Sequence, residues 1–521
     1  MDTGWDVTVE VRDCPDALAE IEGRLRGAGD ELIRWIREDT QNLRLMGFER
    51  ALWLRIGLVC RLCVALFLAA GHQRLDLTGC LGEGWRVKSK FATRVIKTQH
   101  GPVKYGRAYL TRRNGGGWFP LDAALGITQD GFSWPVIDMA TRLASRVSFA
   151  ATRTIIKAIL GWAPSTEAIE RLAIGLGSRA PTFMETFGPF EDDGDVLVIE
   201  VDGKAAPMAT EAELEARRQK RKHKAGCPCG CQRHRSHQRR REKPTKRKKR
   251  GHNSKNGRSA TLVAMYTLKR GEDGRLHGPI NKKIWGRFGL RKAAMQWARD
   301  QARRRGFPPE TQRRVQIAID GEKCLQKELQ RLFPNATFTL DLRHAEEYLW
   351  KTGRLFHPEA SPELQQWIEP LKMLLLGGHV DALLERLREI LASVPPRGPN
   401  TKIKRKTLAK HIAFFEARRK MMRYDEYRRD DLVLATGVIE GACRYVVGER
   451  LDCAGMRWTL KGAERVLQLR CLELNGDWES FITWAEEQTI QEMKAQKMVK
   501  LRHQNPQSNP KAPQKQAACA A

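Results

Sequence analysis

The chain has 521 residues, enough for about two to four domains and at least one large core. It carries 92 Lys and Arg against 61 Asp and Glu, a net charge of +31. A surplus of this size predicts a polyanionic partner: nucleic acid is the simplest, and a membrane surface would satisfy the same electrostatics.

The N-terminal residues argue against export and against membrane insertion. The first segment, MDTGWDVTVEVRD, is acidic and lacks the apolar core of a secretory signal. The most apolar stretch, 51–71, contains Arg55 and Arg61, so we expect a buried amphipathic helix rather than a membrane span. Twelve cysteines in such a chain indicate reduced thiols. We therefore expect a cytoplasmic protein associated with the nucleoid.

Residues 1–190 are predicted to form a mainly helical region with one β-hairpin. β-Branched residues flank His100-Gly101-Pro102 in the manner of a hairpin turn. Ser165 is a good N-cap for a helix that would end near Gly177. Short consecutive helices of this kind form either a helix-turn-helix DNA reader or a plain packing unit, and both interpretations stay open.

A buried strand over 196–201 leads to an acidic residue. The run VLVIEV is followed by Asp202-Gly203, and we predict that the strand ends there. Asp-Gly ends many strands for backbone reasons alone. A turn is therefore the competing interpretation of Asp202.

A strongly basic, Cys/His-rich loop over 211–258 follows this strand. Its core, 217–250, holds seventeen Lys or Arg and one Glu, a net +16. Such a segment should stay open until phosphates neutralise it, although a solvated loop that serves only solubility would look the same. The residues predicted to contact DNA are Arg239, Arg240, Arg241, Lys246, Arg247, Lys248, Lys249 and Arg250.

The same loop clusters five potential zinc ligands, Cys227, Cys229, Cys231, His234 and His237. Zinc takes four Cys or His ligands in a tetrahedron. The C-x-C-x-C-x2-H-x2-H spacing is not a standard zinc pattern, and one short loop is geometrically tight. A zinc knuckle and free thiols both remain open.

The rest of the chain predicts a catalytic α/β domain split by helices. We expect its first part at 191–344, a helical insertion at 345–430, closing helices at 431–490 and a disordered tail at 491–521. A second strand near 259–268, a hairpin partner near 280–286 and a helix at 291–306 precede another apolar strand that ends in Asp320-Gly321. A further strand, 336–341, then passes directly into a helix.

Two aspartates at strand ends predict a metal site. In a mixed α/β sheet, ligands gather where strands end, so adjacent strands would bring Asp202 and Asp320 together. Two close carboxylates repel unless a cation lies between them. Mg²⁺ held by such carboxylates and by substrate phosphates suits phosphoryl transfer, and a pair of ions would need a third acid.

Four segments resemble the DDE transposases of bacterial insertion sequences, closest to the Kra- and Lre-type groups, which are relatives of Mutator-like elements. They are VDGKAAPM, IAIDGEKCL, FTLDLRHAEEYLW and VIEGACRYVVGERLDCAGMRW, and the resemblance covers about 195–478. It implies an RNase H-like sheet whose first and fourth strands carry Asp202 and Asp320. The third acid is implied at Glu440, in a segment that the family writes Gly-Ser-Gly-x-x-Glu and that here is Ala-Thr-Gly-Val-Ile-Glu. We expect an apolar helix after it to hold Glu440 rigidly.

The resemblance also implies residues beside the site. Asp341 and His344 fit an acid-x2-His pattern of Mutator-like relatives, although the same residues equally predict a helix N-cap with a surface histidine. Arg444 could pair with Glu440 or contact a phosphate. Arg457 and Trp458 combine a cation with an aromatic ring, which suits unpaired bases, but a Trp is more often part of a core.

The function implied is that of a DNA transposase that uses two Mg²⁺ ions, or Mn²⁺ in their place, to cut and join strands. Its partners would be the DNA of the element ends and the target DNA. A homo-oligomer would bind them, and no membrane partner is expected. An RNase H-like nuclease or resolvase would use the same acids and stop after hydrolysis. A domesticated DNA-binding protein without catalysis would need only the basic loop.

Overall fold

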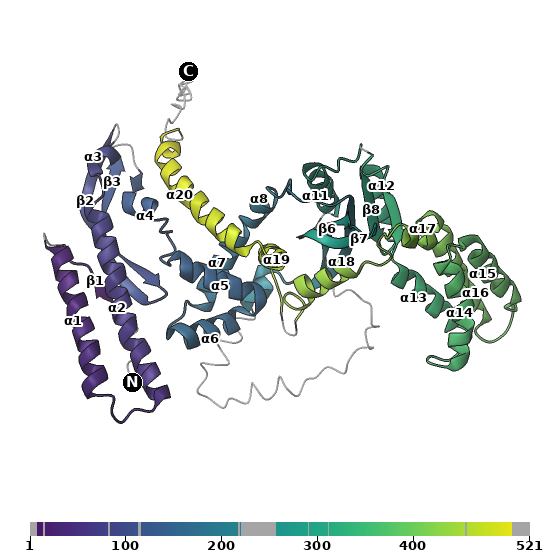
Figure 1. The fold of residues 1–521 in the computed structure, drawn as a ribbon, viewed down its shortest axis with the longest axis horizontal. Coiled ribbons are helices and arrows are strands. Elements are labelled where there is room, and N and C mark those ends of the chain that lie inside the picture. The colour runs from purple at the N-terminus through teal and green to yellow at the C-terminus, as the bar shows by residue number, and fades with distance from the viewer. Residues whose placement is uncertain are drawn as a thin grey trace, which may run out of the picture. The chain divides into compact units, whose positions relative to one another are not determined.

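The structure is a computed structural model that describes residues 8–13, 16–81, 84–112, 116–216, 219, 257–289, 291–310, 312–453 and 456–502. The chain divides into two compact units (Figure 1). Unit 1 contains Met1–Leu172 and Glu479–Ala521, and unit 2 contains Ala173–Trp478.

Unit 1 combines two long helices with a twisted hairpin. Helix α1 (Ala17–Glu38) packs on α2 (Leu45–Gln73), and α2 packs on the sheet. The predicted hairpin at His100-Gly101-Pro102 is confirmed: β2 (Trp85–Thr98) and β3 (Gly101–Arg112) pair antiparallel from Thr98↔Gly101 outward. The short strands β1 (Val9–Glu10) and β4 (Gly117–Trp118) both pair with β3. The core between these elements includes Ile21, Leu62, Ala65, Val103 and Tyr105.

Helix α2 is less buried than the sequence suggested. It buries one stripe that includes Leu62, Ala65 and Leu68, and it buries Arg61 as well. Met46 and Phe67 remain 64% and 56% exposed, so apolar residues occupy its outer face too. Within the described residues, α2 is the one helix whose length and composition would allow it to cross a membrane. Because apolar residues occupy the exposed face as well as the buried one, a 3.6-residue periodicity is weak over this stretch.

Further helices, most of them short, complete unit 1. They are α3 (Leu77–Cys80), α4 (Pro120–Ala124), α5 (Trp134–Arg146), α6 (Phe149–Leu160), α7 (Thr166–Gly177), which runs on into unit 2, and most of α20 (Trp478–Arg502). The expected cap at Ser165 is present, because its hydroxyl accepts a hydrogen bond from the Ala168 N–H at 3.1 Å. Helix α20 continues past residue 491, where the sequence predicted an irregular tail to begin.

Unit 2 is built on a five-stranded mixed sheet in the order β7-β6-β5-β8-β9. The strands are β5 (Val196–Pro207), β6 (Gly257–Arg270), β7 (Leu276–Phe288), β8 (Arg314–Ile319) and β9 (Thr337–Leu340). Strands β5, β8 and β9 are parallel to one another, and β6 is antiparallel to both its neighbours. Val196 to Val201 are all buried, as expected for a strand covered on both faces.

The predicted end of the first strand at Asp202-Gly203 is wrong. Only the parallel pairing of β5 with β8 stops there, at Val201↔Ile319. The antiparallel pairing with β6 continues to Pro207↔Gly257 and keeps the backbone extended. Asp202 therefore lies within β5, at the point where its parallel neighbour ends.

Helices cover this sheet and extend beyond it (Figure 1). Helix α11 (Arg291–Arg304) packs on β6 and β7, α19 (Leu460–Asn475) packs on β7, and α8 (Ala180–Met184) packs on α19. Helix α12 (Lys323–Leu332) follows β8, and α13 (Leu342–Gly353) follows β9. An all-helical insertion follows, comprising α14 (Pro362–Leu376), α15 (Val380–Ser393), α16 (Thr401–Glu416), η1 (Arg419–Met421) and α17 (Tyr424–Arg429). The predicted fold class is confirmed: an α/β chain whose mixed, RNase H-like sheet is flanked by helices and interrupted by a helical insertion, with a mainly helical N-terminal region.

Candidate active site at the ends of three parallel strands

Three aspartates lie immediately after the point where the parallel pairing between three neighbouring strands stops. Val201 pairs with Ile319, and Ile319 pairs with Leu340. The next residues along the three strands are Asp202, Asp320 and Asp341. Since neighbouring strands lie about 4.7–4.9 Å apart, the three backbone positions share one edge of the sheet.

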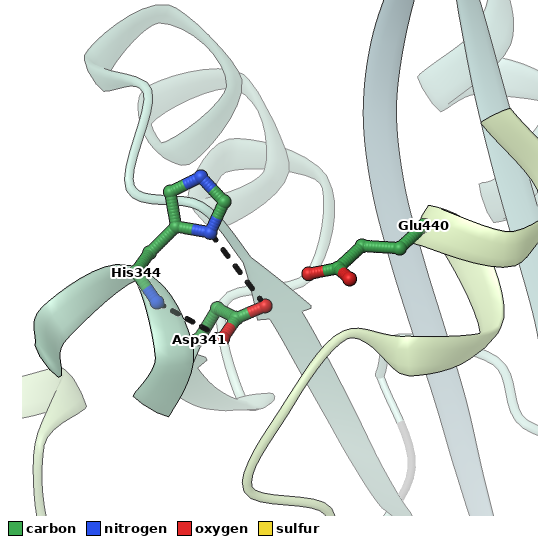
Figure 2. A group of neighbouring side chains, drawn as sticks. All are labelled: Asp341, His344 and Glu440. Carbon is green, nitrogen blue, oxygen red and sulfur yellow. Dashed lines mark hydrogen bonds and ion pairs between the residues drawn. The ribbon is translucent and has the colours of Figure 1, made fainter. Parts of the chain in front are cut away.

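Glu440 reaches this edge from a distant part of the chain. It lies in the short helix α18 (Gly437–Ala442), which packs on β5 and β6. Figure 2 shows its carboxylate directed toward Asp341 and His344. One ligand atom from each of these three residues lies within 4.8 Å of the others, so the group could hold a metal ion.

Asp341 is fully buried and its oxygens are occupied by hydrogen bonds. One oxygen accepts the N–H groups of Arg343 at 2.7 Å and His344 at 3.3 Å, which makes Asp341 the N-cap of α13. The other accepts the Thr436 N–H at 3.1 Å and the Thr436 hydroxyl, and lies 3.8 Å from His344 Nδ1. Burial alone would raise the pKa of Asp341, but the hydrogen bonds from His344 and Thr436 outweigh it and hold that pKa well below its usual range.

His344 is the basic neighbour of this acid. The interaction with Asp341 raises the pKa of His344 above its ordinary value despite partial burial, and the charge of Asp320 contributes in the same direction. The two interpretations of Asp341-x2-His344, a helix N-cap and a pair of residues beside the acids, are therefore compatible. Asp341 caps the helix, as a plain N-cap would, and the same geometry directs a half-exposed histidine toward the acids (Figure 2).

Asp202 and Asp320 are partly exposed and differ in their contacts. Asp202 accepts the Gly203 N–H at 2.6 Å on one oxygen and the Cys443 thiol at 3.4 Å on the other. Asp320 accepts the Glu322 N–H at 2.8 Å on one oxygen. Within the described residues, the other Asp320 oxygen accepts no hydrogen bond, so it is available to a ligand.

Burial and neighbouring negative charges act on Glu440. Its pKa is raised first by burial and then by the charges of Asp341 and Asp202, while Arg343 and His344 act in the opposite direction. Arg343 is 3.9 Å away and largely exposed, so this ion pair contributes little. A hard cation between the acids would relieve the repulsion, and carboxylate oxygens are the ligands that Mg²⁺ prefers.

Within the described residues, the one group of three ligand atoms within 4.8 Å of one another is Asp341, His344 and Glu440, and the structure does not bring Asp202, Asp320 and Glu440 together to that distance. These three acids still offer the oxygen ligands that suit a hard cation. Asp320 and Glu440 present carboxylate oxygens without hydrogen bonds from the described residues, and Asp202 adds a partly exposed carboxylate. Asp341 fits a different role, because its oxygens are already satisfied by backbone and side-chain donors. It connects the start of α13 to the turn that leads into α18.

The remaining predicted residues fall in different places. Arg444 is exposed and pairs with Glu449 at 3.5 Å rather than with Glu440. Arg457 is exposed, whereas Trp458 is 8% exposed, donates to the Leu451 carbonyl at 3.0 Å and lies beneath the guanidinium of Arg450. The predicted ligands and DNA contacts of the basic loop lie outside the described residues: Cys227, Cys229, Cys231, His234, His237, Arg239, Arg240, Arg241, Lys246, Arg247, Lys248, Lys249 and Arg250.

The helix expected after Glu440 differs from its prediction. Helix α18 changes at Cys443 into a π-helix, η2 (Cys443–Gly448), which buries Cys443, Val446 and Val447. Tyr445, in the same segment, is 45% exposed. The wider turn rotates successive side chains differently from an α-helix, and it directs Cys443 toward Asp202.

Glu200 was not predicted from the sequence to belong to this region. It lies two residues before Asp202 on β5 and is 0% exposed. Burial raises its pKa to about 7, against the hydrogen bonds from Tyr266 and Ile439, and the charges of Asp341 and Glu440 raise it further. The available signal was a single carboxylate inside the apolar run VLVIEV, because an ionisable group there requires partners.

The comparisons with known proteins are sparse. No family model and no curated protein matches the sequence. Among solved structures, the chain is similar to the strand transfer complex of the Drosophila P element transposase, with 12% identity and a TM-score of 0.30, over 67% of this chain and 93% of that chain. A TM-score this low carries no argument, so a functional assignment must come from the residues of this chain.

Proposed function

We propose that the protein is a DNA transposase of the DDE type, in which Asp202, Asp320 and Glu440 hold divalent metal ions. The observation that carries the proposal is the register in which β5 pairs with β8. Asp202 and Asp320 follow paired residues on adjacent parallel strands, and Cys443, three positions after Glu440, contacts Asp202. These contacts support a site in which acids 118 and 120 positions apart in the sequence act together.

Mg²⁺, or Mn²⁺, would neutralise charge on the scissile phosphate and acidify the attacking oxygen. The chain's own contribution is to fix the phosphodiester and the nucleophile in one geometry. Water would first attack at the element end, and the freed 3′-hydroxyl would then attack target DNA. His344 lies beside Asp341, which raises its pKa, and in its protonated form it would stabilise negative charge at this edge.

The basic loop supplies the main contact to DNA in this proposal. Its net +16 lies between two strands of the catalytic sheet, so bound phosphates would be held near the acids. Its Cys and His residues would hold zinc and fold part of the loop. Zinc analysis of protein purified without chelator tests this: about one zinc per chain supports it, and none rejects it. A homo-oligomer would bring two element ends together.

The decisive experiment compares cleavage by three proteins. The substrate is a plasmid that carries the chain's own gene with its flanking DNA, incubated with Mg²⁺. Asp320→Asn should reduce cleavage by more than the roughly 100-fold that removal of an outer-shell partner costs, since it removes a direct ligand. It should retain DNA binding, because it removes a negative charge.

Asp300→Asn is the matched control, because Asp300 is an exposed acid on α11 that pairs with Gln296 at 3.0 Å. It should cleave like the wild type. Cleavage by Asp320→Asn at the wild-type rate would remove Asp320 from the active site. Wild-type cleavage without joining of pre-cut ends to a target would instead indicate a nuclease.

A further inference from the structure

Glu200 is a buried carboxylate that none of the proposed chemistry uses. It lies on the same face of β5 as Asp202, because alternate residues of a strand share a face. Its flanking residues Ile199 and Val201 are both 0% exposed. A carboxylate in this environment is tolerated only when its oxygens are hydrogen-bonded.

Both oxygens of Glu200 have a partner, and the partners come from different elements. The Tyr266 hydroxyl on β6 donates to one oxygen at 2.7 Å. The Ile439 N–H in α18 donates to the other at 2.8 Å. Glu200 therefore joins the central strands of the sheet to the helix that carries Glu440.

The hydrogen bond to Ile439 replaces a helix cap that α18 lacks. Ile439 is the third residue of α18, and its N–H is one of the donors that a helix N-terminus leaves without an intrahelical partner. Thr436 occupies the N-cap position, yet its side chain makes no cap hydrogen bond, because its hydroxyl donates to Asp341. The carboxylate of Glu200, 239 positions earlier, takes the place of that cap.

The position of α18 depends on such contacts more than that of a long helix would. Six residues are too few for a stable isolated helix, so tertiary partners must fix it. The residue after Ile439 is Glu440. A shift of about 1 Å in a catalytic group can reduce a rate by about 100-fold.

We propose that Glu200 is a positioning residue: it caps α18 from β5 and thereby holds Glu440 in place beside Asp341 and His344. The catalytic consequence rests on the proposed function, because it requires Glu440 to be a metal ligand. The structural consequence, a helix fixed by a carboxylate from the sheet, is independent of it.

The test uses the full-length chain and two substitutions at Glu200. Glu200→Gln retains an acceptor for the Ile439 N–H and a partner for the Tyr266 hydroxyl. Glu200→Met keeps the volume and removes both acceptors. Hydrogen exchange of the peptide covering 436–442 reports on α18 without metal or DNA. Exchange should rise at least 10-fold in Glu200→Met and stay within about 3-fold of the wild type in Glu200→Gln.

Manganese binding, followed by electron paramagnetic resonance, connects this change to the site. Mn²⁺ affinity should fall about 10- to 100-fold in Glu200→Met, as it does when an outer-shell partner is removed, and should be retained in Glu200→Gln. Glu464→Ala is the matched control, because the partly buried Glu464 accepts the Phe288 N–H at 2.7 Å but belongs to α19. It should lower the melting temperature and leave both readouts unchanged.

The outcomes separate the two proposals. Unchanged exchange in Glu200→Met, equal effects of Glu464→Ala, or a Glu200→Gln variant that behaves like Glu200→Met would overturn the positioning role. If Glu200→Met does not fold, Tyr266→Phe removes one donor to Glu200, and exchange over 436–442 should still rise; unchanged exchange there rejects the role. If Glu440→Gln binds Mn²⁺ like the wild type while Glu200→Met still raises exchange, the proposed function fails and the positioning role stands.

Discussion

Gly321 shows how one residue controls the position of an acid. It follows Asp320 and has a φ of 87°, in the left-handed region that residues with a Cβ adopt at a cost. A Cβ at this position would lie 2.8 Å from Leu340 and would also meet the Arg418 side chain. The turn after β8 is therefore fixed by the absence of a side chain as much as by hydrogen bonds.

We predict that Gly321→Ala lowers the cleavage rate as well as the melting temperature. The left-handed backbone should cost about 1–2 kcal/mol of unfolding free energy, and the close approach to Arg418 and Leu340 should displace Asp320. Gly274→Ala is the control, since Gly274 has a φ of 74° and open space around its Cβ position. It should lose similar stability and keep full activity. Equal activity of the two variants would contradict the role of the turn.

At the scale of elements, the helical insertion contacts the turn that carries Asp320. Arg418, which follows α16, is 5% exposed, donates to the Gly321 carbonyl at 2.8 Å and stacks on Phe414. The insertion thus supports the edge of the sheet from outside it. The hydrogen bond from Arg418 fixes the backbone at Gly321, the residue immediately after Asp320.

We expect Arg418→Gln to reduce the cleavage rate about 10- to 100-fold, as the removal of other groups that support a metal ligand does. Arg419→Gln provides the control, because Arg419 is exposed and pairs with Asp381 on α15. Steady-state kinetics should show a lower kcat for Arg418→Gln and wild-type kinetics for Arg419→Gln. A wild-type kcat for Arg418→Gln would separate the insertion from the site.

A second element-scale contact fixes the segment before β5. Asp193 is 8% exposed at its side chain and accepts two hydrogen bonds from Arg305, at 2.8 and 2.6 Å. Burial alone would raise the pKa of Asp193, but the hydrogen bonds from Arg305 and Thr267 dominate and lower it. A lowered native pKa means that the ionised form stabilises the fold above the ordinary pKa of 3.8, and that this contribution is lost as the pH falls through the native value.

Asp193→Asn should therefore lower the unfolding free energy by about 3 kcal/mol at pH 7, where it leaves Arg305 without its charge partner. The difference from the wild type should shrink progressively below pH 3.8. Urea midpoints measured from pH 7 to pH 2.5 test this, with the exposed Asp300→Asn as control. A difference that is constant over the whole range would show that the charge of Asp193 is not responsible.

For the whole molecule, the distribution of charge makes a prediction about DNA binding. About half of the net charge lies within 217–250. Replacing the five basic residues at 246–250 with Gln should lower the slope of log K against log salt by up to about 0.9 for each phosphate that the loop no longer neutralises. Fluorescence anisotropy with a labelled duplex at several salt concentrations measures the slope.

The control changes a similar charge elsewhere. Gln substitutions at four exposed arginines of α1, Arg24, Arg26, Arg34 and Arg37, reduce the net charge by nearly the same amount. Their slope should match the wild type. An equal fall in both variants would assign the salt dependence to overall charge rather than to the basic loop.

Local sequence patterns were sufficient for the elements of this fold. Apolar runs indicated β5 and β8, a β-branched hairpin pattern indicated β2 and β3, and Ser165 marked the start of α7. These features depend on neighbours a few residues away, which a sequence displays directly. The acids at Asp202 and Asp320 were visible for the same reason, because each follows such a run.

Only the tertiary structure decided how those pieces are joined. The continuation of β5 past Asp202 depends on pairing with β6, and the pairing of Arg444 with Glu449 follows from the π-helix after α18. The hydrogen bonds that hold α18 join Thr436 to Asp341 over 95 positions and Ile439 to Glu200 over 239. Buried carboxylates take whichever donors the fold brings to them, and no local pattern encodes a partner at that separation.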